Sequence, residues 1–387
     1  MQIRTRKQSN FFIILLVLTV VCIGCAQEET ERNTKEFQTE YERIKVLKVA
    51  GDLERPWSIA FLPDGRKMIT EGPGRLNILE NGELTVVNGT PEVNDRMNGL
   101  LDVVLHPDYE ENGWIYLTFS RPGPDDNATH ALVRGRLNGH DFVDMEEIFV
   151  QNRYSDPCAR CASRLAWDSE GYLYMSIRDI WENKILAQDL SDHSGSILRL
   201  NDDGSVPADN PFFDDPDAAG EIYSYGHRAI QGLVIDQVNN EIWATEHGPR
   251  GGDELNYIER GNNYGWPVVS LGRSYSDDKE FEDEWTVARH KEGMVDPVYE
   301  LLPTHAPSGL ALVTADNFPS WQGNLLSGGL AGQRIRRLVI KNYTVIHDEE
   351  LLLFEIGRIR DIREGPDGNI YILTDGNPGA LYMMEPA

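Results

Sequence analysis

A glycine-rich stretch in the second half of the chain carries the densest set of groups that could do chemistry. Residues 246–256 read EHGPRGGDELN, and residues 262–267 read NNYGWP. Glycine and proline allow the backbone to turn several carbonyl oxygens toward one point, and Asp253 and Glu254 add carboxylates. These hard oxygen ligands suit calcium. The pattern therefore predicts a calcium site, and a glycine-rich hairpin with a solvated acidic edge is the alternative.

Arginines that could share one ligand form a second set. Arg228 lies at the end of a predicted strand, and Arg358 and Arg360 fall on one strand face because side chains alternate. Paired guanidinium groups can hold a carboxylate-bearing ligand through bidentate hydrogen bonds. The alternative is that these arginines pair with the numerous surface acids.

Several function classes are disfavoured. The sequence has 36 Lys and Arg residues and 63 Asp and Glu residues, which gives a formal net charge of −27. Such a surface repels phosphate backbones, so nucleic acid is not an expected partner. The sequence has no G-x-S-x-G nucleophile motif and no G-x-G-x-x-G between a strand and a helix. A serine hydrolase and a nicotinamide-binding fold are therefore not expected.

The elements that must position these residues recur six times. Each copy is a polar turn ending near Gly or Asn, followed by a strand in which apolar residues alternate, so that one face is expected to be buried. The turns fall at residues 62–65, 106–113, 167–171, 236–240, 319–323 and 366–368.

The repeats predict an all-β protein with the fold of a six-bladed β-propeller, one blade per copy. A jelly roll or double sandwich is the alternative, which the repeat count disfavours. The strand at residues 44–50 is expected to complete the sheet that contains residues 380–384 and so to cover both terminal edges. The loops at residues 95–99, 154–164 and 247–256 are expected to meet at one end of the central channel.

The N-terminus resembles a bacterial lipoprotein signal. A basic segment precedes the apolar run of residues 11–23, which is too short to span a bilayer comfortably. Gly24 and Cys25 follow, so cleavage would leave Cys25 as the lipidated first residue, and an ordinary signal peptide is the alternative. We expect a signal peptide over 1–24, a polar tether over 25–43 and the propeller over 44–387. The protein is thus expected to be exported and lipid-anchored, in the periplasm or cell envelope.

Cys158 and Cys161 are the cysteines expected in the folded body. An oxidising compartment favours a disulfide between them, and two free thiols are the alternative. A zinc site is disfavoured because no second C-x-x-C and no matching histidine pair is present.

From about Leu53 to the C-terminus, the chain resembles the soluble aldose sugar dehydrogenases that use pyrroloquinoline quinone (PQQ), also called the glucose/sorbosone dehydrogenase family. The matching stretches keep the family's order and are residues 56–65, 99–103, 187–190, 204–212, 246–256, 263–267, 306–309 and 358–361. The resemblance implies a six-bladed propeller that oxidises sugars at the anomeric carbon. A histidine takes the hydroxyl proton, the quinone takes the hydride, and calcium polarises the quinone.

The resemblance also assigns roles to particular positions. Gly248 and Pro249 match the carbonyls of the quinone-side calcium, and Glu254 and Tyr264 match a second, structural calcium site. Asp179 matches the acid that orients the catalytic histidine. The positions that match contacts to the quinone are Arg228, Tyr275, Arg358 and Arg360.

This chain departs from the family pattern where proton transfer should occur. The family's His-Phe-Gly-Ser-Arg is replaced by RCASR at residues 160–164, so Arg160 stands at the position of the base. A guanidinium group stays protonated and cannot accept a proton. We hypothesise that Arg160 forms a salt bridge with Asp179. Further departures at Met97, Asn98, Ala229 and Ala331 remove polar contacts to the cofactor, at a combined cost of several kcal/mol.

Two functions remain open on the sequence. One is a PQQ- and calcium-dependent aldose dehydrogenase with an altered proton-transfer step. The other is a propeller that binds a carbohydrate or other small ligand without quinone and without oxidising it. The fold is common to both and does not decide between them.

Overall fold

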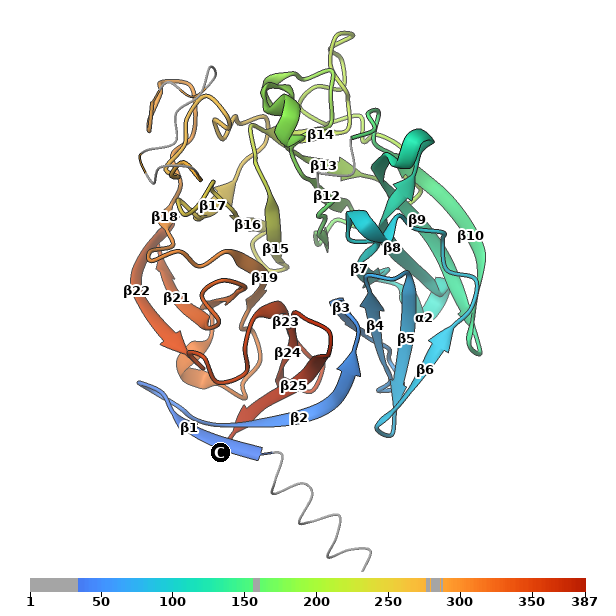
Figure 1. Cartoon of the computed structure of the whole chain (residues 1–387), viewed down its shortest axis with the longest axis vertical. Helices are drawn as coiled ribbons and strands as arrows, with labels where there is room; N and C mark the ends of the chain where they lie inside the picture. Colours follow the sequence, from blue (N-terminus) through green and yellow to red (C-terminus); the bar gives the residue numbers. More distant parts are fainter. Residues whose placement is uncertain (1–33, 156–160, 276–278, 280–285, 287) are drawn as a thin grey trace, which may run out of the picture.

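The computed structural model describes residues 34–155, 161–275, 279, 286 and 288–387, and places them in six antiparallel sheets around a central axis (Figure 1). We number the sheets as blades 1 to 6. Blade 1 contains β3 (Pro56–Phe61), β4 (Lys67–Glu71), β5 (Arg75–Glu80) and β6 (Glu83–Val87). Blade 2 contains β7 (Leu100–Leu105), β8 (Trp114–Pro122), β9 (Ala128–Asn138) and β10 (Asp141–Val150). Blade 3 contains β11 (Leu165–Trp167), β12 (Leu173–Ile177), β13 (Ser196–Leu200) and β14 (Ile222–Tyr225).

The second half of the ring continues in the same way. Blade 4 contains β15 (Ile230–Asp236), β16 (Glu241–Glu246), β17 (Glu254–Ile258) and β18 (Tyr299–Glu300). Blade 5 contains β19 (Pro307–Leu312), β20 (Leu325–Gly329), β21 (Ile335–Lys341) and β22 (Thr344–Leu351). Blade 6 contains β23 (Ile359–Glu364), β24 (Ile370–Thr374), β25 (Gly379–Pro386), β2 (Arg43–Leu53) and β1 (Thr34–Gln38). The short helices are η1 (Asp95–Met97), α2 (Tyr109–Asn112), η2 (Pro124–Asp126), η3 (Trp181–Gln188) and η4 (Pro319–Trp321).

The six-bladed propeller predicted from the repeats is confirmed. Each predicted turn joins the first strand of a blade to its second strand, and the first strands contact one another around the channel. One detail differs from the expected alternation, because second strands such as β12 and β24 are buried along their whole length. Both of their faces are covered because each blade packs between two others. We call the end of the channel that carries the six turns the turn end, and the opposite end the loop end.

The predicted closure of the ring is also confirmed. β2 pairs with β25, with Val46 opposite Met384 and Ala50 opposite Leu381, so the N-terminal strand completes the C-terminal blade. β1 then pairs with β2, which means that part of the segment assigned to the tether is folded. The N–H of Glu40 holds this segment by donating to Oε1 of Glu349 at 2.6 Å. This hydrogen bond joins the segment after β1 to blade 5, which is remote in sequence.

The predicted signal peptide and Cys25 lie outside the described residues, so export and lipid anchoring stay predictions. No helix in the described part of the chain has the length and apolar character needed to cross a bilayer.

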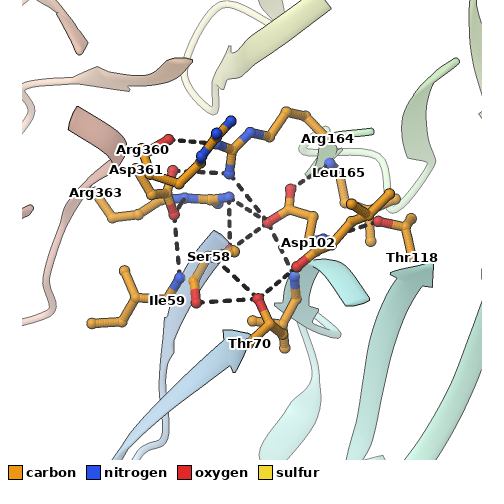
Figure 2. A network of polar contacts seen from close by, with 12 residues as sticks. Ser58, Ile59, Thr70, Asp102, Thr118, Arg164, Leu165, Arg360, Asp361 and Arg363 are labelled. Atoms are coloured by element: carbon orange, nitrogen blue, oxygen red, sulfur yellow. Dashed lines mark hydrogen bonds and ion pairs between the residues drawn. The ribbon is translucent and has the colours of Figure 1, made fainter. Parts of the chain in front are cut away.

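Four charged side chains from the innermost part of the blades form a network across the channel, in which Asp102, Arg164 and Asp361 are buried and Arg363 is partly buried (Figure 2). Asp102 on β7 accepts hydrogen bonds from Nη2 of Arg363 and from the N–H of Leu165, both at 2.7 Å. Asp361 on β23 accepts from Nη1 of Arg164 at 3.0 Å and from Nε of Arg363 at 3.2 Å.

The same network links further blades. Oγ of Ser58 on β3 donates to Asp102 at 2.5 Å. Arg164 donates to the carbonyl of Gln231 on β15 and to the carbonyl of Arg360, each at 2.8 Å. Blades 1, 2, 3, 4 and 6 are therefore joined by charged groups that have left water, and buried charges are stable only when they are paired in this way.

Candidate functional site

A pocket of about 220 Å³ lies at the loop end of the channel. Each of the three loops predicted to meet there contributes a lining residue, namely Asn98, Ala162 and His247. The other lining residues are Arg178, Gln231, Ala306, Leu330, Arg358 and Arg360. A second hollow of about 430 Å³ shares Asn98, Arg358 and Arg360 with it. We call the two hollows together the central pocket.

The central pocket is rich in positive charge. Arg358 and Arg360 lie on one strand face as predicted, and both bind the carboxylate of Asp375, at 2.8 and 2.9 Å. Arg360 also donates to Oε1 of Gln231 at 2.9 Å, and its guanidinium carbon lies 4.4 Å from the ring centre of Trp57. One carboxylate thus serves two arginines, which leaves positive charge for a ligand. The alternative drawn from the sequence, that these arginines pair with acids, therefore holds only in part.

Arg178 is a pocket residue that the sequence reasoning missed. It directly follows β12 and precedes Asp179, so its place at the end of a predicted strand was the available signal. Nε of Arg178 lies 3.4 Å from Oδ1 of Asp179. Arg178 therefore adds a third guanidinium group to the pocket. It also places a positive charge beside Asp179, the acid that the resemblance assigns to orienting a histidine.

Asp179 is fully enclosed. Its Oδ2 accepts a hydrogen bond from the indole N–H of Trp266 at 2.8 Å, and its own N–H donates to the carbonyl of Arg228 at 2.8 Å. Burial raises the pKa of Asp179, and the neighbouring Arg178 and Arg228 partly offset this effect. Arg160, the predicted partner, lies outside the described residues, so the proposed salt bridge stays a prediction.

Arg228 is buried beside two indole rings, with its guanidinium carbon 5.2 Å from the ring centre of Trp181 and 5.4 Å from that of Trp266. Nη1 donates to the carbonyls of His247 at 2.9 Å and Gly248 at 3.2 Å. Nε is buried and finds no acceptor among the described residues. Leaving such a donor unsatisfied costs about 1–3 kcal/mol, so this atom is one that a ligand oxygen would satisfy.

Tyr275, the remaining predicted quinone contact, is exposed. Its ring packs edge-on against Trp181, with centroids 6.1 Å apart. Burial lowers the pKa of Arg228, and Asp179 and Tyr275 partly offset this effect. The structure therefore places Tyr275 with Arg228 around Trp181, and His247 lines both the cavity beside Arg228 and the central pocket.

All four predicted metal-site residues line one small cavity of about 20 Å³ next to Arg228, which is the size of a single ion or water. The Gly248 carbonyl accepts from Arg228, and the Pro249 carbonyl accepts from the N–H of Arg273 at 2.7 Å. Each carbonyl oxygen keeps a second lone pair for a cation. The hydroxyl of Tyr264 is used elsewhere, because it donates to the Tyr257 carbonyl at 2.6 Å.

Two carboxylates meet beside this cavity. Glu254 lies opposite Glu246 in the β16–β17 register, and Nδ2 of Asn256 donates to both, at 2.8 Å to Glu246 and 3.3 Å to Glu254. Burial and the charge of Glu246 raise the pKa of Glu254 well above its usual range. Oδ1 of Asn256 is buried without a donor in the described part of the chain. Within that part no group of three His, Cys, Asp or Glu side chains gathers as a metal site, so carbonyl and amide oxygens would have to complete the ligand set.

His247 brings an imidazole to the wall of the central pocket. Its Nε2 lies 2.7 Å from the carbonyl of Pro307, and because a carbonyl only accepts, Nε2 carries the proton and Nδ1 keeps a lone pair. Burial, together with the charge of Arg228, lowers the pKa of His247 to about 3. The ring is therefore neutral at working pH and a weak proton acceptor.

The segment that follows position 160 is firmly attached. Nδ2 of Asn98 donates to the Cys161 carbonyl at 2.6 Å, and the N–H of Ala162 donates to Nε2 of His130 at 3.1 Å. Cys161 is buried, and burial raises the pKa of its thiol to about 11. Cys158 lies outside the described residues, so the disulfide and the pair of free thiols both stay predictions.

Comparison with known proteins identifies relatives along nearly the whole propeller. Residues 53–383 match the family described as glucose/sorbosone dehydrogenase. The chain is 37% identical to the aldose sugar dehydrogenase YliI of Escherichia coli, over 89% of this chain and 93% of that protein. It superposes on the crystal structure of the soluble aldose sugar dehydrogenase of Escherichia coli in its apo form with a TM-score of 0.84 and 35% identity, over 89% of this chain and 100% of that one. The PQQ-bound aldose sugar dehydrogenase of Streptomyces coelicolor gives a TM-score of 0.68 and 26% identity, over 88% and 97% of the two chains.

Proposed function

The chain belongs to the glucose/sorbosone dehydrogenase family, and from this premise we propose that it binds PQQ in the central pocket and oxidises aldoses at the anomeric carbon. The observation that carries the proposal is the cluster of Arg178, Arg358 and Arg360 in one pocket of a chain whose net charge is −27. An excess of guanidinium groups in a hollow suits a ligand with several carboxylates. The PQQ-bound relative supports this choice of ligand.

The residues present fit PQQ, which is a tricarboxylate. Arg358 and Arg360 would bind carboxylates beside Asp375, and the unpartnered Nε of Arg228 would gain an acceptor. When bound, PQQ supplies a two-electron acceptor for the hydride that leaves C1 of the sugar, which becomes a lactone.

The proton of the anomeric hydroxyl needs a separate acceptor. Arg160 at the family's base position cannot accept it. Asp179 is enclosed by Trp266 and Arg178, and His247 has an available Nδ1 but a pKa of about 3. We propose that proton removal limits the rate, because the imidazole on the pocket wall is a weak base.

A reconstitution experiment tests this function. We expect the purified protein to bind PQQ in the presence of calcium and to reduce a dye slowly with an aldose panel. Arg228→Gln should weaken PQQ binding by roughly 10- to 100-fold, because it removes a charge-assisted hydrogen bond. Titration followed by absorbance measures the affinity, and Arg66→Gln, a surface arginine paired with Asp64, serves as the matched control.

The outcomes separate the two candidate functions. PQQ binding with slow dye reduction supports the altered dehydrogenase. Absence of PQQ binding by the wild-type protein would overturn it and favour a propeller that binds a carbohydrate or other small ligand without oxidising it. Asn98, which departs from the family pattern and occupies the pocket wall with a hydrogen bond to the Cys161 carbonyl, is the observation that favours this second candidate.

We also propose that calcium occupies the small cavity formed by Gly248, Pro249 and Glu254. A divalent cation would offset the repulsion between Glu246 and Glu254 and would use the free lone pairs of the two carbonyls. In this site the ion would fix the loop that carries His247 and hold Glu254 ionised.

Calcium is expected to raise the thermal midpoint of the EDTA-treated wild-type protein and to leave Glu254→Gln nearly unchanged. At 100 times its Kd, calcium would stabilise the wild type by about 2.7 kcal/mol. Glu254→Gln should itself stabilise the metal-free protein, because it removes a charge that burial and Glu246 disfavour. Differential scanning calorimetry measures both effects, with Glu83→Gln on the exposed strand β6 as control. An equal calcium shift in Glu254→Gln and wild type would contradict the assignment.

A further inference from the structure

A further cavity, of about 540 Å³, lies at the turn end of the molecule between blades 4 and 5. Its lining includes Asp236, Glu241, Trp243, Gln322, Asn342 and Tyr343. Asp236 and Glu241 flank the β15–β16 turn, while Asn342 and Tyr343 form the β21–β22 turn. We call this cavity the turn-end groove. It shares no lining residue with the central pocket, which is at the opposite end of the channel.

Three aromatic rings form one wall of the groove and its support. The ring of Tyr343 lies nearly parallel to that of Trp243, with centroids 6.5 Å apart and an interplanar angle of 23°. Tyr257 supports both rings, with centroids 4.6 Å from Tyr343 and 5.3 Å from Trp243. Trp243 is buried, whereas 49% of Tyr343 is exposed. Tyr343 is therefore the ring that can receive a ligand, and the other two hold it in place.

The backbone at Tyr343 is in an unfavourable conformation for its side chain. Asn342 and Tyr343 form a two-residue turn between Lys341 and Thr344, with φ of 50° at Asn342 and 58° at Tyr343. Such turns prefer Asn-Gly, because a bulky side chain in the left-handed region is strained. Backbone strain of this kind concentrates at functional sites, where the role of the side chain compensates for the conformational energy of the backbone.

The polar lining indicates the chemistry of the ligand. Asp236 and Glu241 provide carboxylates, Gln322 and Asn342 provide amides, and no Lys or Arg among the described residues lines the groove. Glu241 and Tyr343 line the same groove, and the Glu241 carboxylate raises the pKa of the Tyr343 phenol. Carboxylates without a cation repel anionic ligands. A ligand with many hydroxyl groups can instead donate to the carboxylates and exchange hydrogen bonds with the amides.

We propose that the turn-end groove binds a neutral oligosaccharide, with the C–H face of a pyranose ring packed on Tyr343 and sugar hydroxyls bonded to Glu241 and Asn342. Aromatic rings with an apolar face and a polar rim suit this kind of ligand. The site is independent of the proposed oxidation in the central pocket, because it uses different residues at the other end of the molecule. It would keep the protein on an oligosaccharide while free sugars reach the loop end.

The experiment uses oligosaccharides that cannot be oxidised at an anomeric carbon. Cellopentaitol and maltopentaitol have a reduced end, so their binding does not depend on the dehydrogenase reaction. Isothermal titration of the PQQ-free protein is expected to show binding of at least one of them. Tyr343→Gly should weaken that binding at least tenfold, which corresponds to about 1.4 kcal/mol. The thermal midpoint should change little, because the favoured Asn-Gly turn offsets the lost ring contacts.

Phe354→Gly is the matched control. Phe354 is also an exposed aromatic residue in the left-handed region, with φ of 59° and 69% exposure, but it lies outside the groove, after β22. This variant should keep wild-type affinity for the alditol. The proposal would be overturned if neither alditol binds the wild type at millimolar concentration, or if Tyr343→Gly binds as tightly as wild type. Binding of spermine that is lost in Tyr343→Gly, without alditol binding, would assign the groove to a cationic ligand instead.

Discussion

Arg160→His is expected to raise the rate of aldose oxidation by the PQQ-loaded protein by roughly 10²-fold or more, because general base catalysis typically contributes 10² to 10⁴. The wild-type side chain is a cation that cannot take the proton of the anomeric hydroxyl. The imidazole of His247 lies on the wall of the central pocket, but its pKa of about 3 makes it a weak base. A histidine at position 160 would supply a lone pair with a pKa near its ordinary value of about 6.5.

The surroundings of the position favour this gain. Residues that directly follow it are held by Asn98 and His130, and Ala162 lines the central pocket. The resemblance assigns to Asp179 the role of orienting a histidine at this position, and Asp179 is buried and accepts a hydrogen bond from Trp266. The rate of the variant should rise with pH as the imidazole loses its proton, and level off above its pKa. Stopped-flow dye reduction across pH 5 to 9 measures both the rate and this profile.

Arg160→Gln is the control for the charge alone. It removes the guanidinium group and supplies no base, so any gain from better PQQ or sugar binding will appear in both variants. The affinity of each variant for PQQ is measured separately by absorbance titration. An Arg160→His protein no faster than Arg160→Gln would show that position 160 is not where the proton is removed.

Asp102→Ala is expected to lower the free energy of unfolding by about 3–5 kcal/mol, the usual cost of breaking a buried ion pair from one side. Asp102 accepts hydrogen bonds from Ser58, Leu165 and Arg363 (Figure 2). Its removal leaves the partly buried Arg363 with Asp361 as its remaining carboxylate, and leaves the N–H of Leu165 without its acceptor. Urea denaturation followed by circular dichroism measures the loss.

A double-mutant cycle tests the origin of this effect. The double variant Asp102→Ala/Arg363→Ala should lose less free energy of unfolding than the sum of the two single variants. The reason is that the double variant removes both charges of the pair and leaves neither one unpaired. Asp64→Ala, which breaks the surface pair with Arg66, should cost no more than about 1 kcal/mol. A loss for Asp102→Ala as small as that for Asp64→Ala would contradict a stabilising role for the network.

The architecture could be predicted from the sequence because its signal is local. Turn residues followed by apolar strands mark the start of β4, β8, β12, β16, β20 and β24, and each signal spans only a few residues. The closing pair of Val46 and Met384 was also predictable, since two unpaired terminal strands need a partner. The burial of the second strands on both faces was not predictable, because the sequence of one blade does not show that neighbouring blades will cover both of its faces.

Part of the site was predictable for a similar reason. Strand alternation placed Arg358 and Arg360 on one face, and the glycine-rich loop grouped Gly248, Pro249 and Glu254 along a short stretch of chain. The hydrogen-bond partners of these residues were not predictable from the sequence. The contribution of Arg178 to the pocket depends on how the blades pack around the channel.

The sequence by itself determined six turn-and-strand units, the closure of the ring and the types of residue carried by the loops. Only the tertiary structure decided that Asp102 meets Arg363, which is 261 residues away. The same holds for the groove that Glu241 of blade 4 and Tyr343 of blade 5 line together. Turn and strand preferences act between neighbours along the chain, so they can be read from its order. Ion pairs and cavities form between segments that approach only when the ring closes, and their geometry follows from packing.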